Sequence, residues 1–148
     1  MIRLLLLSLL SLFLVNCGGG SSSATIDKTS KELLTNRVLY STSCSSENKT
    51  IYQVNKFDDN YWYQENYEDK EMTELLDKEV YQIIEYQDSE FNMLYKEKEY
   101  NCQVSSLEDS RIFVDCIYLD AKENDLSDIN VALYSDKEEA ILDAISCN

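Results

Sequence analysis

The sequence predicts a mainly β fold, an antiparallel meander that forms a curled sheet or a small barrel, with a C-terminal helix and two stapling disulfides. Three observations lead to this prediction. Short runs rich in Tyr, Val, Ile and Phe, which favour strands, follow one another with polar turns between them. Four cysteines are spread over the same part of the chain. Apolar residues at helical spacing lie near its C-terminal end.

The N-terminus has the composition of an export signal. Arg3 supplies a positive charge, and the apolar run 4–14 follows it. This run is shorter than the roughly 20 residues that a membrane-spanning helix needs. Segment 14–17, with the sequence LVNC, resembles the lipobox of bacterial lipoproteins. The resemblance implies that residues 1–16 are a signal peptide and that the mature chain begins at a lipidated Cys17.

The residues after this cysteine predict a flexible linker and a cellular location. Segment 17–30 is small, polar and glycine- and serine-rich, which is typical of a flexible linker, so we expect a single β-rich domain over 31–148. The lipoprotein resemblance places the protein outside the cytoplasm, with the membrane as a partner through the N-terminal lipid. Gly18 directly after the cysteine resembles the pattern sent to the outer membrane in Gram-negative bacteria.

Strand-favouring runs predict eight strands. A short helix that begins near Ser30, capped by Thr29 or Ser30, precedes them. The turns at 58–60 and 88–89 are rich in Asp, Asn and Ser, which bond their own backbone. Strands joined by such short turns are neighbours in the sheet, which favours a meander. The expected strands are 37–43, 50–57, 61–67, 80–86, 91–96, 100–104, 112–119 and 129–134.

Two further helical segments are expected. Met72, Leu75 and Leu76 fall at helical spacing, so 70–78 is predicted to be an amphipathic helical connection. At the C-terminus, the segment 135–138 fits a capping box, with a Ser at its first position and a Glu at its last. We therefore expect a helix over 136–146. Its apolar face, which should pack on the sheet, consists of Ile141, Ala144 and Ile145.

The cysteines form an even set once Cys17 is set aside for lipid. In an oxidising compartment, four such cysteines favour two disulfides, and four cysteines allow three pairings. Cys102 and Cys116 lie at equal sequence distance from residue 109, so they face each other if 100–104 and 112–118 form a hairpin. By elimination, Cys44 would then bond Cys147. A zinc site is disfavoured, because the chain has no C-x₂-C spacing and no histidine.

The charge of the chain limits its partners. It has 13 basic and 28 acidic residues, a net charge of −15, which becomes −16 when the segment 1–16 leaves with its single base. Nucleic acid and anionic lipid are therefore disfavoured as ligands, because phosphate binding needs a basic surface. Cations, basic proteins and neutral ligands are the partners that this charge allows.

The residue types that catalysis commonly uses are sparse, so we expect no catalytic residues, no cofactor and no bound metal. The absence of histidine removes Ser-His-Asp and Cys-His catalysis, and the only glycines lie in the linker. Neighbouring acids at 58–59, 68–69 and 108–109 are compatible with a hydrolase that uses two carboxylates, but turns also favour such pairs. The acidic stretch 120–128 has Lys122 at a ligand position and no glycine at the sixth position, so it is not an EF-hand.

An aromatic run on one expected strand is the best candidate for a binding surface. Tyr61, Tyr63 and Tyr67 should share one face of the strand, and Trp62 should take the other. Cross-strand packing accounts for such a run, and so does an exposed platform for sugar or protein contact.

These observations leave three functional hypotheses. The first is a non-enzymatic, lipid-anchored module that binds an envelope protein or a small ligand. The second is a carboxylate-using envelope hydrolase that acts on glycan. The third is a carrier of a small apolar ligand, because the strand order and anchor resemble those of lipocalin-like small lipoproteins.

Overall fold

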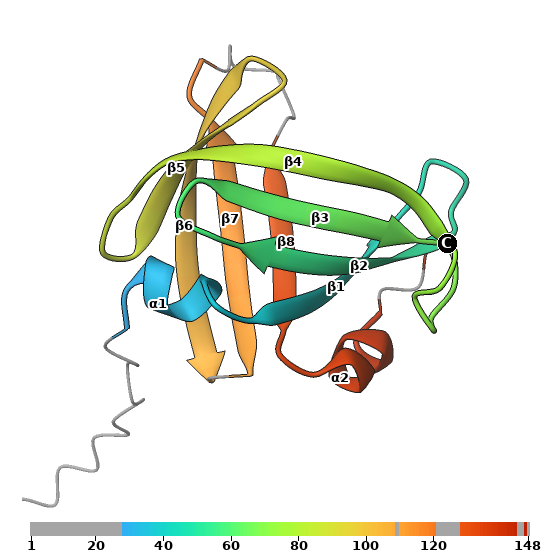
Figure 1. Ribbon diagram of the computed structural model, residues 1–148. Coiled ribbons are helices and arrows are strands. Elements are labelled where there is room, and N and C mark those ends of the chain that lie inside the picture. Colours follow the sequence, from blue (N-terminus) through green and yellow to red (C-terminus); the bar gives the residue numbers. More distant parts are fainter. Residues whose placement is uncertain (1–27, 109, 121–127, 145–146, 148) are drawn as a thin grey trace, which may run out of the picture.

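The computed structural model describes residues 28–108, 110–120, 128–144 and 147. Within these residues, eight antiparallel strands form a closed barrel in the order β1 to β8, which confirms the predicted fold class (Figure 1). The bounds are α1 Ser30–Leu34, β1 Val38–Cys44, β2 Thr50–Phe57, β3 Tyr61–Tyr67, β4 Leu75–Tyr86, β5 Glu90–Tyr95, β6 Lys98–Glu108, β7 Arg111–Tyr118, β8 Ile129–Tyr134 and α2 Lys137–Leu142.

Side chains alternate between the inside and the outside of the barrel, as a pleated strand requires. In β3, Trp62, Gln64 and Asn66 are buried, whereas Tyr61 and Tyr63 are exposed. Antiparallel pairing then arranges the inward residues of β2, β3 and β4 in rows across the wall. These rows are Phe57–Trp62–Tyr81, Asn55–Gln64–Glu79 and Gln53–Asn66–Asp77.

Large apolar side chains fill the interior near α1. Trp62 lies between Phe57 and Tyr81, with ring centroids 5.0 and 4.5 Å away. Phe91 of β5 meets the Phe57 ring edge-on at 6.3 Å. The largest fully buried side chains also include Leu34, Leu39, Met93, Ile112, Leu133 and Val114. Burial of this apolar surface is the main stabilising contribution to the barrel.

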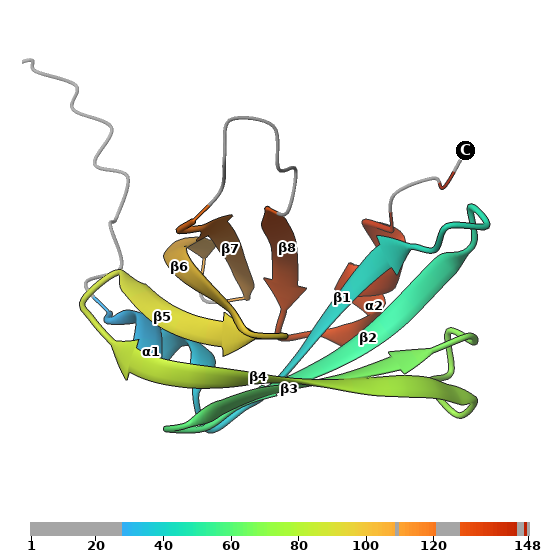
Figure 2. The same ribbon diagram turned by 90° about the horizontal axis from the view of Figure 1, so that it is seen from above.

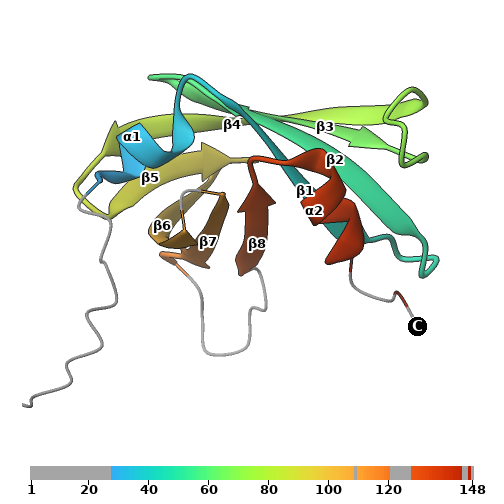
Figure 3. The ribbon, with the colours of Figure 1, turned by 90° about the horizontal axis from the view of Figure 1, so that it is seen from below.

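Helix α1 packs against one end of the barrel. Thr29, one of the two expected caps, accepts the backbone N–H of Glu32, whose carboxylate bonds back to the Thr29 N–H. Leu33 and Leu34 join the hydrophobic core. The buried Ser30 hydroxyl shares its one hydrogen between the backbone carbonyls of Gln87 and Glu90, which lie 2.8 and 2.9 Å from it. This contact holds α1 beside the β4–β5 turn. Figure 3 shows the helix in that position.

The prediction of a helix over 70–78 is wrong, because this segment forms a turn followed by the start of β4. The Asp69 carboxylate accepts the backbone N–H groups of Thr73 and Glu74, which stabilises the turn rather than a helix. Met72 has a φ of 60°, and this left-handed conformation interrupts any helix. The helical spacing of the apolar residues therefore reflects a turn and a strand that happen to be adjacent.

The C-terminal helix is present, but α2 is shorter than the predicted 136–146. The capping box expected at 135–138 does not form. Asp136 is the N-cap instead, with extended backbone and a carboxylate that accepts the Glu139 N–H at 3.1 Å. Helix α2 contacts β1 and β8, so it packs on the sheet as predicted, but the side chain that it buries is Ala140, whereas the predicted Ile141 and Ala144 are half-buried. Residues 145–146 lie outside the described part of the chain.

Both predicted disulfides are present. Cys102 of β6 and Cys116 of β7 lie opposite each other in the ladder and are bonded inside the barrel. Cys44, the last residue of β1, is bonded to Cys147, with a Cα–Cα distance of 5.6 Å. Cys17, the expected lipidation site, lies outside the described residues.

Candidate functional site

The outer surface of β3 to β5 carries the candidate binding surface. Tyr61 and Tyr63 are each 38% exposed, and their ring centroids are 5.8 Å apart. Strand register places Tyr63 beside Val80 of β4, which is 50% exposed, and places Gln82 between Tyr61 and Leu94 of β5. We call Tyr61, Tyr63, Val80 and Leu94 the tyrosine face.

Trp62 does not belong to this surface, which corrects its inclusion among the possible binding residues. Its side chain is fully buried, because the alternation of β3 turns it into the barrel. The indole N–H donates to Asn55 Oδ1 at 2.9 Å. Trp62 is therefore a core residue, as an inward strand position dictates.

Tyr67 lies on the outer side of β3 at the other end of the strand, opposite Tyr52 of β2. Its hydroxyl donates to Glu65 at 3.0 Å. Burial and this carboxylate raise the pKa of Tyr67. The half-buried Tyr67 is thus held by a hydrogen bond and is less available for contact than Tyr61 and Tyr63.

A shallow groove of about 230 Å³ runs beside Tyr63. Lys78 and Glu65 form a 2.6 Å ion pair at its edge. The hydrogen bond from Lys78 lowers the pKa of Glu65, and the same contact raises the pKa of Lys78. The groove is lined by Val54, Lys56, Tyr63, Gln64, Glu65, Lys78, Glu79 and Val80. It offers aliphatic, aromatic and charged groups side by side.

The acidic pair 58–59 serves the turn that precedes β3. Asp58 accepts the backbone N–H groups of Asn60 and Tyr61, at 2.8 and 2.7 Å. The bond from Asn60 is the main cause that lowers the pKa of Asp58. Burial is the main cause that raises the pKa of the Tyr63 phenol, and the nearby Asp58 carboxylate adds to it. Asp58 therefore serves the turn and contributes negative charge beside the tyrosine face.

The other acidic pairs carry no paired-carboxylate site in the described residues. Asp69 shapes the turn before β4, and a backbone hydrogen bond from Glu74 is the main cause of its lowered pKa. The side chains of the pair 108–109 lie outside the described part. In each of the two described pairs, one carboxylate accepts backbone N–H groups of a turn: Asp58 in the first pair and Asp69 in the second. Turn formation thus explains why an acidic residue stands at each of these two positions.

Inside the barrel, β1 to β3 carry a chain of hydrogen-bonded polar side chains. Asn55 donates to Ser41, Ser41 donates to Gln53, and Gln53 donates to Asn66, all within 3.0 Å. Gln64 joins the chain at Asn66. We call Ser41, Gln53, Asn55, Gln64 and Asn66 the amide network; all five are buried.

Carboxylates of β4 border the amide network. Asn66 donates to Asp77, and Glu79 accepts hydrogen bonds from Gln64, Tyr81 and Tyr95. Burial is the main cause that raises the pKa of the Tyr81 phenol, and Glu79 adds to it. These contacts satisfy the network from within the barrel, which is what a buried polar layer needs to be stable.

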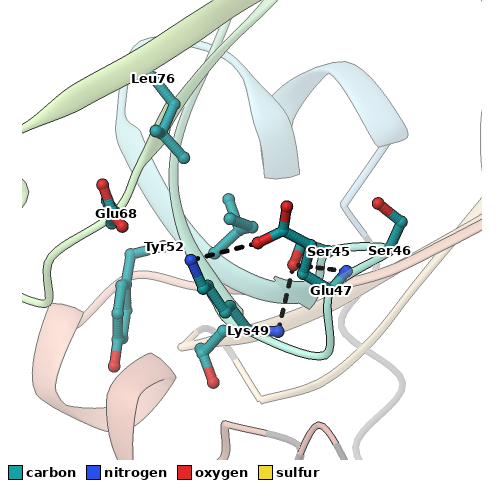
Figure 4. Close-up of a pocket in the computed structure, with 9 residues that line it drawn as sticks. Ser45, Ser46, Glu47, Lys49, Tyr52, Glu68 and Leu76 are labelled. Carbon is teal, nitrogen blue, oxygen red and sulfur yellow. Dashed lines mark hydrogen bonds and ion pairs between the residues drawn. The ribbon is translucent and has the colours of Figure 1, made fainter.

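A larger groove of about 510 Å³ lies between the β1–β2 hairpin and the start of β4 (Figure 4). On one side, the Ser45 hydroxyl accepts the backbone N–H groups of Glu47 and Lys49, so this wall is a self-satisfied turn. Glu68 and Leu76 lie on the opposite side in Figure 4. The groove is open, and the apolar side chains of Ile51, Tyr52 and Leu76 line it together with polar ones.

Tyr61 and Tyr63 follow from the sequence, whereas Val80, Leu94 and the amide network do not. Lys78, Val80 and Gln82 alternate on β4, so a period of two places them on one face of that strand, but only the register with β3 brings this face beside the tyrosines. The helix predicted over 70–78 also obscured where this strand begins. Polar residues at every second position of β2 and β3 are consistent with the network but do not distinguish it from a row that faces water.

The described residues hold no group of three or more acidic or cysteine side chains placed to bind a metal ion. Most of the acidic stretch 120–128 lies outside them. None of the helices in the described part is long and apolar enough to span a membrane. No protein-family model, curated protein or solved structure matches the chain.

Proposed function

We propose that the protein is a lipid-anchored lipoprotein of the cell envelope that acts, without catalysis, as a binding module for another envelope protein. The tyrosine face carries this proposal. Its two exposed rings and two exposed aliphatic side chains lie on strands of a disulfide-bonded barrel. Tyr is enriched at protein interfaces because its ring offers rigid apolar area and its hydroxyl a polar contact.

The charge of the molecule defines the kind of partner. Exposed acids border the tyrosine face, with Asp58 at the turn before β3, Glu85 on β4 and Glu99 opposite Leu94. Lys78 is neutralised by its pairing with Glu65. An apolar centre with an acidic border complements a partner with an apolar patch and basic residues around it. A second copy of this chain fits poorly, because two molecules of net charge −15 repel each other.

The lipobox resemblance at 14–17 supports the anchor. A lipid on Cys17 and the linker that follows would hold the barrel near the membrane while leaving it free to turn. Such confinement raises the local concentration of the module around partners in the same envelope. A moderate intrinsic affinity is then sufficient for binding.

The carrier hypothesis rests on the barrel fold alone. The interior near α1 is filled by large side chains, and the wall beyond it is lined by the amide network. This wall is polar, so it offers an apolar cargo little of the apolar lining that a small-molecule cavity provides. The hydrolase hypothesis loses support because Asp58 and Asp69 bond turn backbone.

The test uses the full chain, exported in a bacterial host, with a photo-crosslinking residue at Gln82, between Tyr61 and Leu94. The same group at Asp115, on the exposed side of β7, is the matched control. The crosslinked protein is identified, purified and titrated against wild type. Tyr61→Ser with Tyr63→Ser should weaken binding by roughly 30-fold or more, as loss of central aromatic contacts does.

Three controls separate the parts of the proposal. Ile117→Ser, which removes an exposed apolar residue of β7, should leave the affinity unchanged. Cys17→Ser should release the protein from the membrane fraction without changing the affinity of the purified chain. Crosslinks at Gln82 only to a second copy or to glycan, or equal affinity of the tyrosine variant, would overturn the surface; membrane retention of Cys17→Ser would overturn the anchor.

A further inference from the structure

The junction between β1 and β8 is the weakest in the barrel. Among the described residues, only Tyr40 and Tyr134 pair across it, whereas the β1–β2 ladder runs the whole length of β1. Continuing the antiparallel register would place Ser41 opposite Leu133 and Ser43 opposite Val131. Neither pair forms in the described ladder, so the strands diverge beyond Tyr40 (Figure 2).

The C-terminal segment bridges this junction. Helix α2 follows β8 directly and contacts both β8 and β1. Figures 2 and 3 both show it alongside the two strands. Its non-covalent contacts are few: Ala140 is its one buried side chain, Asp143 pairs with Arg111 at 2.7 Å and accepts the Tyr134 hydroxyl, and Lys137 donates to the Glu71 carbonyl at 3.1 Å. The firm tie is covalent, because Cys147 bonds Cys44 at the end of β1.

The two disulfides differ in their accessibility. Cys102 and Cys116 are fully buried in the core, so a reductant reaches them only when the barrel opens. Cys44 is exposed and Cys147 is half-buried. Thiol–disulfide exchange requires a thiolate to approach one of the two sulfurs directly, so access decides which bond reacts first.

We propose that the Cys44–Cys147 disulfide is a redox latch that keeps the β1–β8 junction closed. A dithiol reductant opens it in two steps. In the first step, a thiolate of the reductant attacks one latch sulfur, forms a mixed disulfide with it and releases the other latch cysteine as a thiolate. In the second step, the other thiol of the reductant attacks the reductant sulfur of this mixed disulfide and releases the remaining latch cysteine. The latch gains two electrons and two protons, leaving Cys44 and Cys147 as thiols, and the dithiol becomes a disulfide.

Opening the latch releases the end of β1, which stays paired with β2, from the segment that follows α2. Ser41 of the amide network lies on the divergent part of β1, so its buried hydrogen bonds become reachable by water. The larger groove changes as well, because Thr50 lines it and its Oγ1 lies 3.7 Å from Cys147 Sγ. The reduced and oxidised proteins therefore present different surfaces. This proposal is independent of the tyrosine face and of the anchor.

The test treats the folded full chain with dithiothreitol as the dithiol probe. Differential alkylation and mass spectrometry follow each disulfide, and hydrogen exchange follows peptides over 38–44 and 129–134. The latch should be reduced roughly tenfold or more faster than Cys102–Cys116, because Cys44 is exposed whereas Cys102 and Cys116 are fully buried. Exchange over both peptides should rise after latch reduction, whereas exchange over 100–118 should stay unchanged.

The double variant Cys44→Ser with Cys147→Ser should show the same raised exchange without reductant. If this variant does not fold, the wild-type reduction series still decides the question, because it begins from the folded protein. Equal reduction rates for the two disulfides would overturn the proposal. Unchanged exchange over 38–44 and 129–134 after latch reduction would overturn it as well.

Discussion

Strands β5 to β8 and strands β1 to β4 enclose one interior, yet they turn different chemistry toward it. Strands β5 to β8 contribute a buried disulfide and apolar side chains, which include Phe91, Met93, Ile112 and Val114. Strands β1 to β4 contribute apolar side chains only near α1, and they contribute the amide network beyond them. Burial of apolar side chains thus stabilises one wall of this small barrel, and hydrogen bonds between buried side chains stabilise the other.

The two kinds of wall specify the structure differently. Apolar contacts are non-directional, so they stabilise any register that buries them. Amide contacts are directional, and each buried amide left unpaired costs free energy. A slip of one residue in β2 would turn Gln53 and Asn55 outward and Lys56 inward, which the network penalises strongly. The β1–β4 wall therefore fixes the pairing of these strands.

The largest effect should come from the apolar half. Phe91→Ala removes a fully buried ring that contacts Phe57 and Tyr86, and it should lower the free energy of unfolding by about 3–5 kcal/mol. Leu94→Ala, at a partly exposed position of the same strand, is the control and should cost much less. Urea unfolding with both disulfides intact, followed by Trp62 fluorescence, measures both. A loss below about 1 kcal/mol for Phe91→Ala would remove the distinction between the two walls.

The amide network should show an intermediate effect. Asn55→Ala removes the acceptor of the buried Trp62 indole N–H and should cost about 1–3 kcal/mol. Asn92→Ala, which removes an amide bonded to Glu85 near the surface, is the matched control. The same urea experiment compares them. Equal losses for the two variants would mean that the network contributes no more than surface hydrogen bonds do.

The antiparallel meander, its strand order and both disulfides followed from patterns that act locally or through simple symmetry, whereas the choice between a curled sheet and a closed barrel did not. Strand-favouring runs and Asp-rich turns are read residue by residue, and the equal spacing of Cys102 and Cys116 about their hairpin fixed one pairing. The helix over 70–78 was wrong because its apolar spacing fitted two structures, and the Asp69 turn decided between them.

For the candidate site, the sequence predicted which tyrosines share a face of β3, because that depends on one strand alone. Val80 and Leu94 could not be added, since their neighbours are set by the register of three strands. The amide network depends on the same long-range pairing. Polar residues at alternate positions look the same whether they face water or one another, until the barrel closes.

The smallest effect concerns the turn that leads from the amide wall to the tyrosine face. Two backbone hydrogen bonds hold Asp58 ionised and keep its pKa below the ordinary value in the folded protein. Its stabilising contribution is therefore complete above the unfolded pKa of about 3.9 and is lost as pH falls through the lower folded value. Because Asp58 is exposed, Asp58→Asn should cost only a few tenths of a kcal/mol at pH 7. That cost should shrink toward zero at a pH below the folded pKa of Asp58. Urea unfolding at this acid pH and at pH 7 measures the difference. Asp115→Asn removes one exposed charge on β7 while leaving both backbone hydrogen bonds of the turn, and an equal pH dependence in that variant would show that net charge, rather than the turn, is responsible.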